Sequence, residues 1–207
     1  MSEDMETKEK PKYELHGLLE CSSVKNTDIV QTMSSYDTQL LNITDDAQLE
    51  SHSSYWTTFF KIMALPPDSG KTSKRLDPEA IEAGFVRIRK DQVHRQVYLD
   101  LIYISPEYRK SNLAKQTLIQ LFISTFGYWG MERISCSTLH CNPAGNALMK
   151  SVGMDKFGIG RSSDRFLGEM VDRIHYEFLD DSEHFKFTNL EELERLKELW
   201  KVKNSQQ

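Results

Sequence analysis

The segment RKSNLA, between an apolar run and a helix-like pattern, carries residue types that suit anion binding. It comprises Arg109, Lys110, Ser111, Asn112, Leu113 and Ala114. Backbone N–H groups in the first turn of a helix lack intrahelical acceptors, and the helix dipole adds about half a positive charge there. Arg109 and Lys110 add formal charge, while Asn112 tolerates the positive φ that lets a loop backbone approach phosphate oxygens. The segment therefore predicts a pyrophosphate site.

The elements that would position this segment follow from the apolar pattern on either side. Residues 96–105 are rich in β-branched and aromatic side chains, which predicts a central strand covered on both faces. Residues 113–128 return to helical periodicity. Residues 133–139 predict a second short central strand, and residues 142–152 predict a helix closed by Gly153. The segment thus lies at a junction of strand, tight loop and helix.

The remaining elements are predicted from shorter patterns. Four apolar residues recur at helical spacing and stop before Pro66, which predicts a buried helix that ends in a loop. They are Trp56, Phe59, Phe60 and Met63. The other predicted elements are strands at residues 13–21, 83–89 and 171–179 and a helical region at residues 26–41.

The chain is expected to form one domain with two flanking segments. Its 207 residues are enough for a sizeable core. Residues 1–12 are dense in Glu, Lys and Asp, which predicts a flexible tail. Thr188 and Glu191 form a capping box that opens a C-terminal amphipathic helix within residues 188–207. We expect this helix to contact a partner protein or a second copy of the chain, and residues 13–187 to form the domain.

Composition and charge exclude several classes of protein. Hydrophobic residues make up 39% and charged residues 28%, with a net charge of -5, which is typical of a soluble globular protein. No apolar run is long enough to cross a bilayer, and the N-terminus has no signal core. The acidic balance disfavours nucleic-acid binding. Three cysteines without CxxC spacing indicate neither disulfides nor a metal site. We expect a cytoplasmic protein, with the nucleus as the alternative.

Two blocks of the sequence resemble the GCN5-related N-acetyltransferase family. The family's pyrophosphate loop has Gln or Arg, two residues, Gly, one residue, then Gly or Ala. Arg109 and Ala114 match the first and last positions, and Asn112 stands in place of the Gly. The stretch NPAGNALMKSVGM, residues 142–154, resembles the family's second block and lies at the right distance downstream. Residues 157–179 are similar to the C-terminal hairpin of the ribosomal-protein-type acetyltransferases.

This resemblance implies a fold and a co-substrate. The fold class is α/β, with a mixed central sheet splayed between its fourth and fifth strands and helices on both faces. Acetyl-CoA is the implied co-substrate, without a metal, and a primary amine on a peptide or small molecule is the implied acceptor. In the family the pantetheine arm bonds to the backbone of the fourth strand, here Ile102, Tyr103 and Ile104. Asn142 is implied on the cofactor side, although Asn also favours a plain N-cap role.

Three residues are candidates for proton transfer. Several relatives carry Glu or Tyr eleven residues before the first residue of the loop, and that position here is Tyr98. Asp100 lies two residues on, on the same face of the strand, where a carboxylate requires a partner or a function. The alternative for Asp100 is a structural bond to backbone or to an Arg. His140, near the end of the next strand, is a third candidate base or else a structural histidine.

Three positions depart from the family pattern. The frequent Tyr acid of the second block is replaced by Met149, which has no proton to donate. Ser137 stands where some relatives have His, and Gly145 where ribosomal-protein-type relatives often have Ser. Two functions therefore stay open. The chain is an acetyltransferase that uses Tyr98, Asp100 and bound water, or a non-catalytic module that binds CoA or a partner protein.

Overall fold

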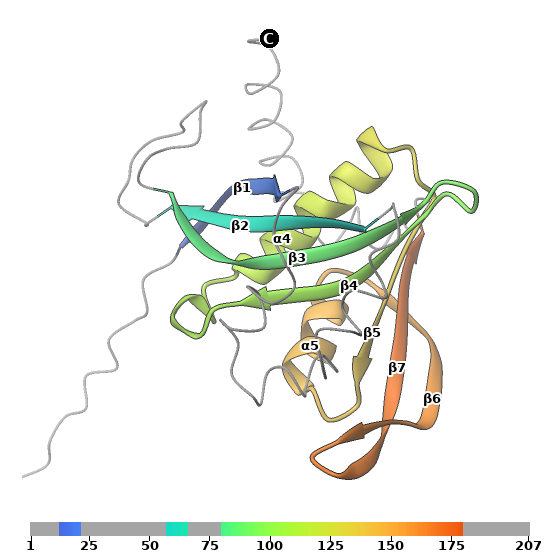
Figure 1. The fold of residues 1–207 in the computed structure, drawn as a ribbon. Helices are drawn as coiled ribbons and strands as arrows, with labels where there is room; N and C mark the ends of the chain where they lie inside the picture. Colours follow the sequence, from blue (N-terminus) through green and yellow to red (C-terminus); the bar gives the residue numbers. More distant parts are fainter. Residues whose placement is uncertain (1–12, 22–56, 66–79, 180–207) are drawn as a thin grey trace, which may run out of the picture.

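One mixed β-sheet runs through the described part of the molecule (Figure 1). The computed structural model describes residues 13–21, 57–65 and 80–179. Its strands lie in the order β1-β2-β3-β4-β5-β7-β6. They are β1 (Glu14–Cys21), β2 (Thr57–Leu65), β3 (Ile81–Asp91), β4 (Gln96–Ile104), β5 (Arg133–Leu139), β6 (Asp155–Phe166) and β7 (Glu169–Leu179). The pair β4 and β5 is parallel, and the other neighbouring pairs are antiparallel.

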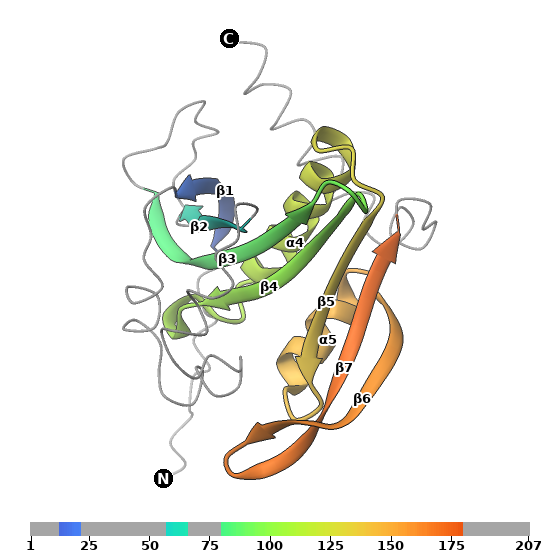
Figure 2. The same cartoon turned by 45° about the vertical axis from the view of Figure 1, so that its right-hand side comes forward.

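Two α-helices follow the central strands and share one hydrophobic core. The first, α4 (Leu113–Phe122), begins after a short 3-10 helix (Pro106–Tyr108) and continues into a π-helical segment (Ile123–Tyr128). The second, α5 (Pro143–Ser151), follows β5. Buried side chains of both helices join those of the strands in a single core, and Figure 2 shows α4 behind β3 and β4. Both helices therefore position the ends of the two parallel strands.

The helix α4 also fixes the edge of the sheet. Leu118, Ile119 and Phe122 are fully buried, as expected for a helix that packs on central strands. Gln116 is buried although it is polar, and its side-chain oxygen accepts a hydrogen bond from the N–H of Leu15 at 2.7 Å. Because a buried amide without a partner is costly, this bond ties β1 to the helix.

Most of the predicted elements are confirmed. The strands predicted at residues 13–21, 83–89, 96–105, 133–139 and 171–179 are β1, β3, β4, β5 and β7, and the C-terminal hairpin is β6 with β7. The helices predicted at residues 113–128 and 142–152 are α4, extended by the π-helical segment, and α5, which Gly153 follows with a φ of 82°. The α/β fold class with a mixed sheet is confirmed as well.

The buried helix predicted before Pro66 is wrong. Residues Thr57–Leu65 form the strand β2, which pairs with β1 on one side and β3 on the other. Phe60, Ile62 and Ala64 are its regularly spaced buried residues, so the true period is two. A short apolar run fits both periods, and the strands that decide between them lie far away in the sequence.

Several predictions lie outside the described residues. They are the flexible tail at residues 1–12, the helical region at residues 26–41 and the C-terminal helix within residues 188–207.

Pairing between the two parallel strands is short. Four residue pairs join them, from Gln96 with Arg133 to Leu99 with Cys136. Beyond Leu99, β4 has no strand partner on its β5 side within the described residues, and the two strands diverge in Figure 2. The splay predicted between the fourth and fifth strands is therefore present.

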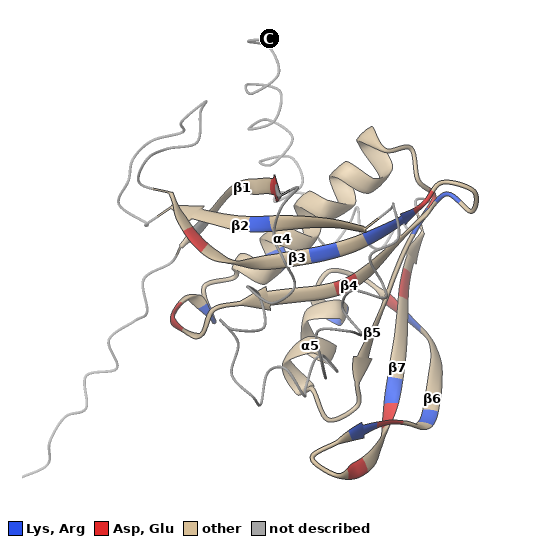
Figure 3. Ribbon diagram, in the orientation of Figure 1, with Lys and Arg blue, Asp and Glu red and all other residues tan. Residues whose placement is uncertain are grey.

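A β-bulge coincides with the point of divergence. On β3, Ile88 pairs with Leu99 but the preceding Arg87 pairs with Leu101. Asp100 is thus the extra residue, and such a residue bends its strand and increases its twist. Figure 3 shows the acidic segment of β4 beside basic segments of β3. The bulge accounts for the change of direction that separates β4 from β5.

Gly84 is required where β3 meets the splayed end of β4. A β-carbon at this position would lie 2.0 Å from the carbonyl oxygen of Tyr103. The contact is with backbone, so only a shift of β3 away from β4 relieves it. We expect Gly84→Ala to lower the free energy of unfolding by about 3 kcal/mol, measured by urea denaturation.

Gly127→Ala is the matched control for this substitution. A β-carbon at Gly127 meets nothing within 4 Å, and the residue lies in the π-helical segment. Ala is favoured over Gly in a helix by roughly 0.5–1 kcal/mol, so this variant should be at least as stable as the wild type. Equal stability of Gly84→Ala and wild type would contradict the close approach of the two strands.

Candidate active site

The predicted anion site is a tight turn that leads into α4. Lys110 and Asn112 both have positive φ, at 67° and 68°. Asn112 is the N-cap residue, and its carbonyl accepts the N–H of Gln116 at 3.1 Å. The N–H groups of the intervening residues 113–115 come before the first intrahelical bond, so they have no acceptor within the helix. The strand, loop and helix junction is therefore present, with unused donors at its helical end.

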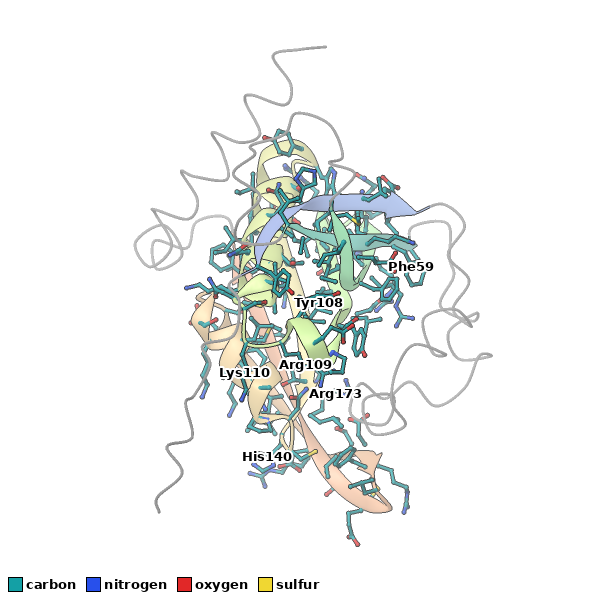
Figure 4. The ribbon with its side chains drawn as sticks, turned by 90° about the vertical axis from the view of Figure 1, so that its left-hand side faces the viewer. Phe59, Tyr108, Arg109, Lys110, His140 and Arg173 are labelled. Carbon is teal, nitrogen blue, oxygen red and sulfur yellow. The ribbon has the colours of Figure 1, made fainter. Side chains whose placement is uncertain are left out.

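Two side chains hold this turn in shape. Nε of Arg109 donates to the carbonyl of Ile104 at 2.9 Å, and the guanidinium lies 5.5 Å from the ring centre of Tyr103. The buried hydroxyl of Ser111 donates to the carbonyl of Tyr108. Arg109 thus joins the turn to the end of β4, and Lys110 is exposed beside it (Figure 4).

The predicted pantetheine contact lies on an open strand edge. Ile102, Tyr103 and Ile104 pair with β3 alone, since β5 has already diverged. No strand of the described part covers the other edge of this stretch, although the carbonyl of Ile104 already accepts from Nε of Arg109 and that of Tyr103 points toward Gly84 of β3. The N–H of Ser105 bonds to the carbonyl of Ala83 at 2.9 Å, which extends the β3 contact to the start of the turn. The open edge therefore runs directly into the predicted anion site.

Asn142 occupies the N-cap of α5. Its side-chain oxygen accepts a hydrogen bond from the N–H of Gly145 at 2.9 Å, and the residue is buried. This geometry is the N-cap role that Asn favours by itself. The contact of Asn142 with a cofactor stays a prediction.

Asn146, which sequence reasoning missed, joins α5 to two strands. Its amide nitrogen donates to the carbonyls of Leu139 at 3.0 Å and Asn142 at 2.7 Å. Its oxygen accepts from the hydroxyl of Tyr176 at 3.0 Å and from that of Thr138. Burial raises the pKa of Tyr176, so this phenol stays a donor at neutral pH. The network locks the helix onto the ends of β5 and β7.

The bulge residue Asp100 is bonded to an arginine of β3. Both of its oxygens accept from Arg89, Oδ2 from Nε at 2.8 Å and Oδ1 from Nη2 at 3.0 Å. The hydrogen bonds that Arg89 donates to this carboxylate raise the pKa of Arg89. Nε of Arg87 lies 3.8 Å from Oδ2. The arrangement matches the structural alternative for Asp100, and its role as a base stays a prediction.

Tyr98 lies next to this ion pair, on the same strand as Asp100. It is half-buried, and its ring centre lies 5.1 Å from the guanidinium carbon of Arg89. The hydroxyl accepts a hydrogen bond from the side chain of Gln96. Register places Tyr98 between Arg89 on β3 and Ser135 on β5. Tyr98 and Asp100 are therefore brought together, as the sequence predicts.

His140 is placed apart from these two residues. It lies in the turn after β5, four residues beyond Cys136, the last residue that pairs with β4. Its side chain is exposed, and its N–H donates to the carbonyl of Asp172 at 2.8 Å. The structure thus gives His140 a position at the far end of β5, away from the point of divergence (Figure 4).

Sequence reasoning missed His175, which lies on β7 directly opposite Ser137 of β5. Its ring is half-buried and its centre lies 5.8 Å from that of Phe157. In the described part of the chain, no hydrogen bond reaches its ring nitrogens. The sequence did contain a pattern that could have identified His175, because residues 171–179 alternate polar side chains with the buried Tyr176 and Phe178. Cross-strand pairs share a face, so His175 stands beside the position that is His in some relatives.

The neighbours of His175 on this face are already paired. Arg173 donates to Asp164 at 2.7 and 2.5 Å and to the hydroxyl of Ser137 at 2.8 Å. The hydrogen bonds from Arg173 lower the pKa of Asp164. Glu177 lies 2.6 Å from Arg133. Unlike its neighbours Arg173 and Glu177, His175 forms no ion pair within the described residues.

Met149, where the resemblance predicts the loss of the usual Tyr acid, lies in a cluster of sulfur atoms. Met149 is 2% exposed, and its sulfur lies 3.3 Å from Sγ of Cys136. The sulfur of Met154 lies 3.8 Å from the same thiol. Burial raises the pKa of Cys136 to about 12. Neither Met149 nor this thiol is suited to protonating a departing thiolate, whose ordinary pKa is near 8.5.

Within the described residues, no group of three or more His, Cys, Asp and Glu side chains is arranged to hold a metal ion. Over the same residues, no helix combines the length and apolar character needed to cross a membrane. Cys136 and Cys141 are free thiols.

A family model matches the part of the chain that holds this geometry. The model of the acetyltransferase (GNAT) family matches residues 39–154, which include the predicted anion site, the open edge of β4 and α5. A search of curated protein sequences found no match.

Solved structures with the same fold are similar to the chain at low sequence identity. A probable acetyltransferase of the GNAT family from Chromobacterium violaceum has a TM-score of 0.58 and 16% identity over 79% of this chain and 82% of its own. A chimera of the Vibrio cholerae spermidine N-acetyltransferase SpeG and hSSAT has a TM-score of 0.57 and 15% identity, over 81% of this chain and 95% of its own. At these identities the likeness concerns the fold alone.

The raised pKa of Cys136 makes a direct prediction. At pH 8 only about one such thiol in ten thousand is ionised, roughly a thousandfold fewer than at an ordinary pKa near 9. Both side chains are partly exposed, so the raised pKa decides the outcome: iodoacetamide should modify Cys141 in the folded chain well before Cys136, as read by peptide mass spectrometry. In guanidinium chloride both should react alike. Equal alkylation of the two in the folded chain would contradict the raised pKa.

Proposed function

The chain belongs to the acetyltransferase (GNAT) family, and on this premise we propose that it moves an acetyl group from acetyl-CoA to a primary amine. One observation carries the proposal, namely the open edge of β4 that begins after Leu99 and runs into the turn before α4. An extended carrier with an anionic head fits this path. A strand edge bonds to amide groups, and a helix N-terminus bonds to phosphate.

The turn before α4 supports binding of the pyrophosphate of acetyl-CoA. Positive φ at Lys110 and Asn112 curves the backbone, and the N–H groups of residues 113–115 are left without helical acceptors. The side chains of Arg109 and Lys110 are exposed and add positive charge. The open edge at Ile102, Tyr103 and Ile104 is then the proposed track for the amide groups of the pantetheine arm.

Acetyl transfer requires a neutral amine at the thioester. Bound acetyl-CoA supplies the activated carbonyl, to whose carbon the amine nitrogen bonds as the C–S bond breaks. The ammonium form of the acceptor must first lose a proton to a base. We propose His175 for this role, acting through water, because it faces Ser137 and forms no ion pair within the described residues. Tyr98 is proposed to orient the amine or the water, and Asp100 to hold Arg89 in place.

The thiolate that departs takes its proton from solvent in this scheme. Met149 has no proton to donate, and the pKa of Cys136 lies too far above that of an ordinary thiol for efficient donation. A thiolate is itself a fair leaving group near neutral pH, so the reaction proceeds without a dedicated acid. The replacement of the usual Tyr is thus compatible with turnover.

The second candidate is a module with the same fold that binds CoA or a partner protein without turnover. The buried Met149 at the position of the usual acid favours it. The two functions are distinguished by measuring the release of thiol from acetyl-CoA in the presence of a panel of peptide N-termini and small amines. Thermal stabilisation by acetyl-CoA without any amine-dependent thiol release would favour the module.

Two substitutions at Asn112 test the anion site. Asn112→Gly should keep the affinity for CoA within about threefold, because Gly adopts the observed positive φ without strain. Asn112→Glu should weaken it by about 100-fold or more, since it places a carboxylate at the positive end of the helix dipole. Isothermal titration with CoA measures both. Unchanged affinity in Asn112→Glu would place the pyrophosphate elsewhere.

The proton acceptor is tested by moving the imidazole across the β5–β7 pair. His175→Gln should lower kcat by about 100-fold or more, with the Kd for CoA unchanged, as expected for loss of a general base. The double variant Ser137→His with His175→Gln should recover at least part of that rate, because these residues face one another. His140→Gln is compared in the same assay. A large loss there with none in His175→Gln would show that the base assignment is wrong.

A further inference from the structure

Among the described residues, the buried Arg87 beside the bulge shares its one nearby carboxylate with Arg89. The side chain of Arg87 is 9% exposed, and within the described part of the chain its Nε and Nη1 atoms are buried without a hydrogen-bond partner. The carboxylate within reach is that of Asp100, 3.8 Å from Nε, beyond hydrogen-bonding distance. Both oxygens of that carboxylate are already bonded to Arg89. One positive charge in the cluster is therefore uncompensated.

Such an arrangement is costly in the absence of a ligand. A buried donor without a partner costs about 1–3 kcal/mol, and more when it is charged. Burial lowers the pKa of Arg87, although a guanidinium stays protonated. Buried groups of this kind call for an ion, a water or a functional partner. A guanidinium presents a planar fork of donors that matches the oxygens of a carboxylate or a phosphate.

Arg87 lies close to the open edge along which the acetyl group is proposed to be carried. Register pairs it with Leu101, two residues beyond the last residue of β4 that pairs with β5. Its face of the sheet also carries Arg89 and Asp100, with Phe59 6.0 Å below the guanidinium. Arg87 and Arg89 together outweigh the single Asp100 by one positive charge. This net positive charge repels a polycation and attracts an anion.

We propose that the two unpartnered donors of Arg87 bind an anionic oxygen group of the acceptor. The acceptor class is then a primary amine that also carries a carboxylate or a phosphate, and not a polyamine such as spermidine. The inference rests on the proposed acetyl transfer and names the substrate class of that same site.

The first experiment asks whether Arg87 binds an anion at all, without reference to activity. Thermal unfolding is followed at saturating CoA, which occupies the pyrophosphate site, while formate or inorganic phosphate replaces chloride at constant ionic strength. We expect either or both anions to raise the Tm of the wild type, and the larger shift to identify carboxylate or phosphate. The same shifts should be absent in Arg87→Met.

The stability of Arg87→Met is itself informative. Replacing a buried unpaired charge by an apolar side chain of similar length should leave the Tm without anions equal to or above that of the wild type. Arg165→Met, at an exposed arginine of β6 that donates to the carbonyl of Gly168 at 2.7 Å, is the matched control and should keep the anion response. An anion response in Arg87→Met equal to that of wild type would overturn the proposal.

The second experiment compares matched acceptors in the transfer assay. Glycine and glycinamide, phosphoethanolamine and ethanolamine, and spermidine are each offered with acetyl-CoA. We expect the acidic member of at least one pair to have a higher kcat/KM, and Arg87→Met to remove that preference by about 10- to 100-fold through KM, as expected for a charged hydrogen bond. Preference for spermidine, or a preference for the acidic member that survives in Arg87→Met, would overturn the inference while leaving acetyl transfer intact. Transfer to no amine would instead overturn the proposed function.

Discussion

The interruption of pairing between β4 and β5 is the constraint on which the rest of the structure depends. The two parallel strands share four residue pairs and part after Leu99 and Cys136. A continuous pair would bury the backbone of Ile102, Tyr103 and Ile104 in the sheet and leave no edge for a ligand. The bulge at Asp100 provides the bend, and its carboxylate is held by Arg89 on the neighbouring strand. The bulge at Asp100 thus combines the change of strand register, the ion pair with Arg89 and the start of the open edge.

Parted strands need support from elsewhere, and buried polar bonds provide it. Gln116 ties α4 to β1, and Asn146 ties α5 to the ends of β5 and β7. Gly84 lets β3 follow β4 closely beyond the bulge, so the open end keeps its antiparallel partner. These bonds lie in the interior, where leaving a polar group unpaired is costly, and they therefore specify the geometry strongly. The elements on either side of the site hold it in place, while the edge of β4 between them has no strand partner in the described part of the chain.

Much of this architecture could be predicted from the sequence because the patterns there are local. The run at residues 96–105, the turn at residues 109–114 and the cap at Asn142 each depend on neighbours in the chain. The strand Thr57–Leu65 was mistaken for a helix because its period is decided by β1 and β3. The ion pair between Asp100 and Arg89 depends in the same way on a cross-strand register that no single segment encodes.

The polar constellation of the site was only partly predictable for the same reason. Tyr98 and Asp100 share one strand and were found, while His175 required the register of β7 against β5. Arg87 lies between the buried residues Val86 and Ile88 and therefore carried a signal, since a buried charge requires a partner. The distance from Arg87 to Asp100 is needed to see that this carboxylate does not form a hydrogen bond with it.

A crystal structure of the chain with acetyl-CoA tests the central claim most directly. We predict that the pyrophosphate oxygens accept hydrogen bonds from backbone N–H groups within residues 110–115, and that the pantetheine amides pair with the open edge of β4 at Ile102, Tyr103 and Ile104. Acetyl-CoA bound away from that edge, or β4 and β5 closed into continuous pairing beyond Leu99 in the complex, would contradict the account.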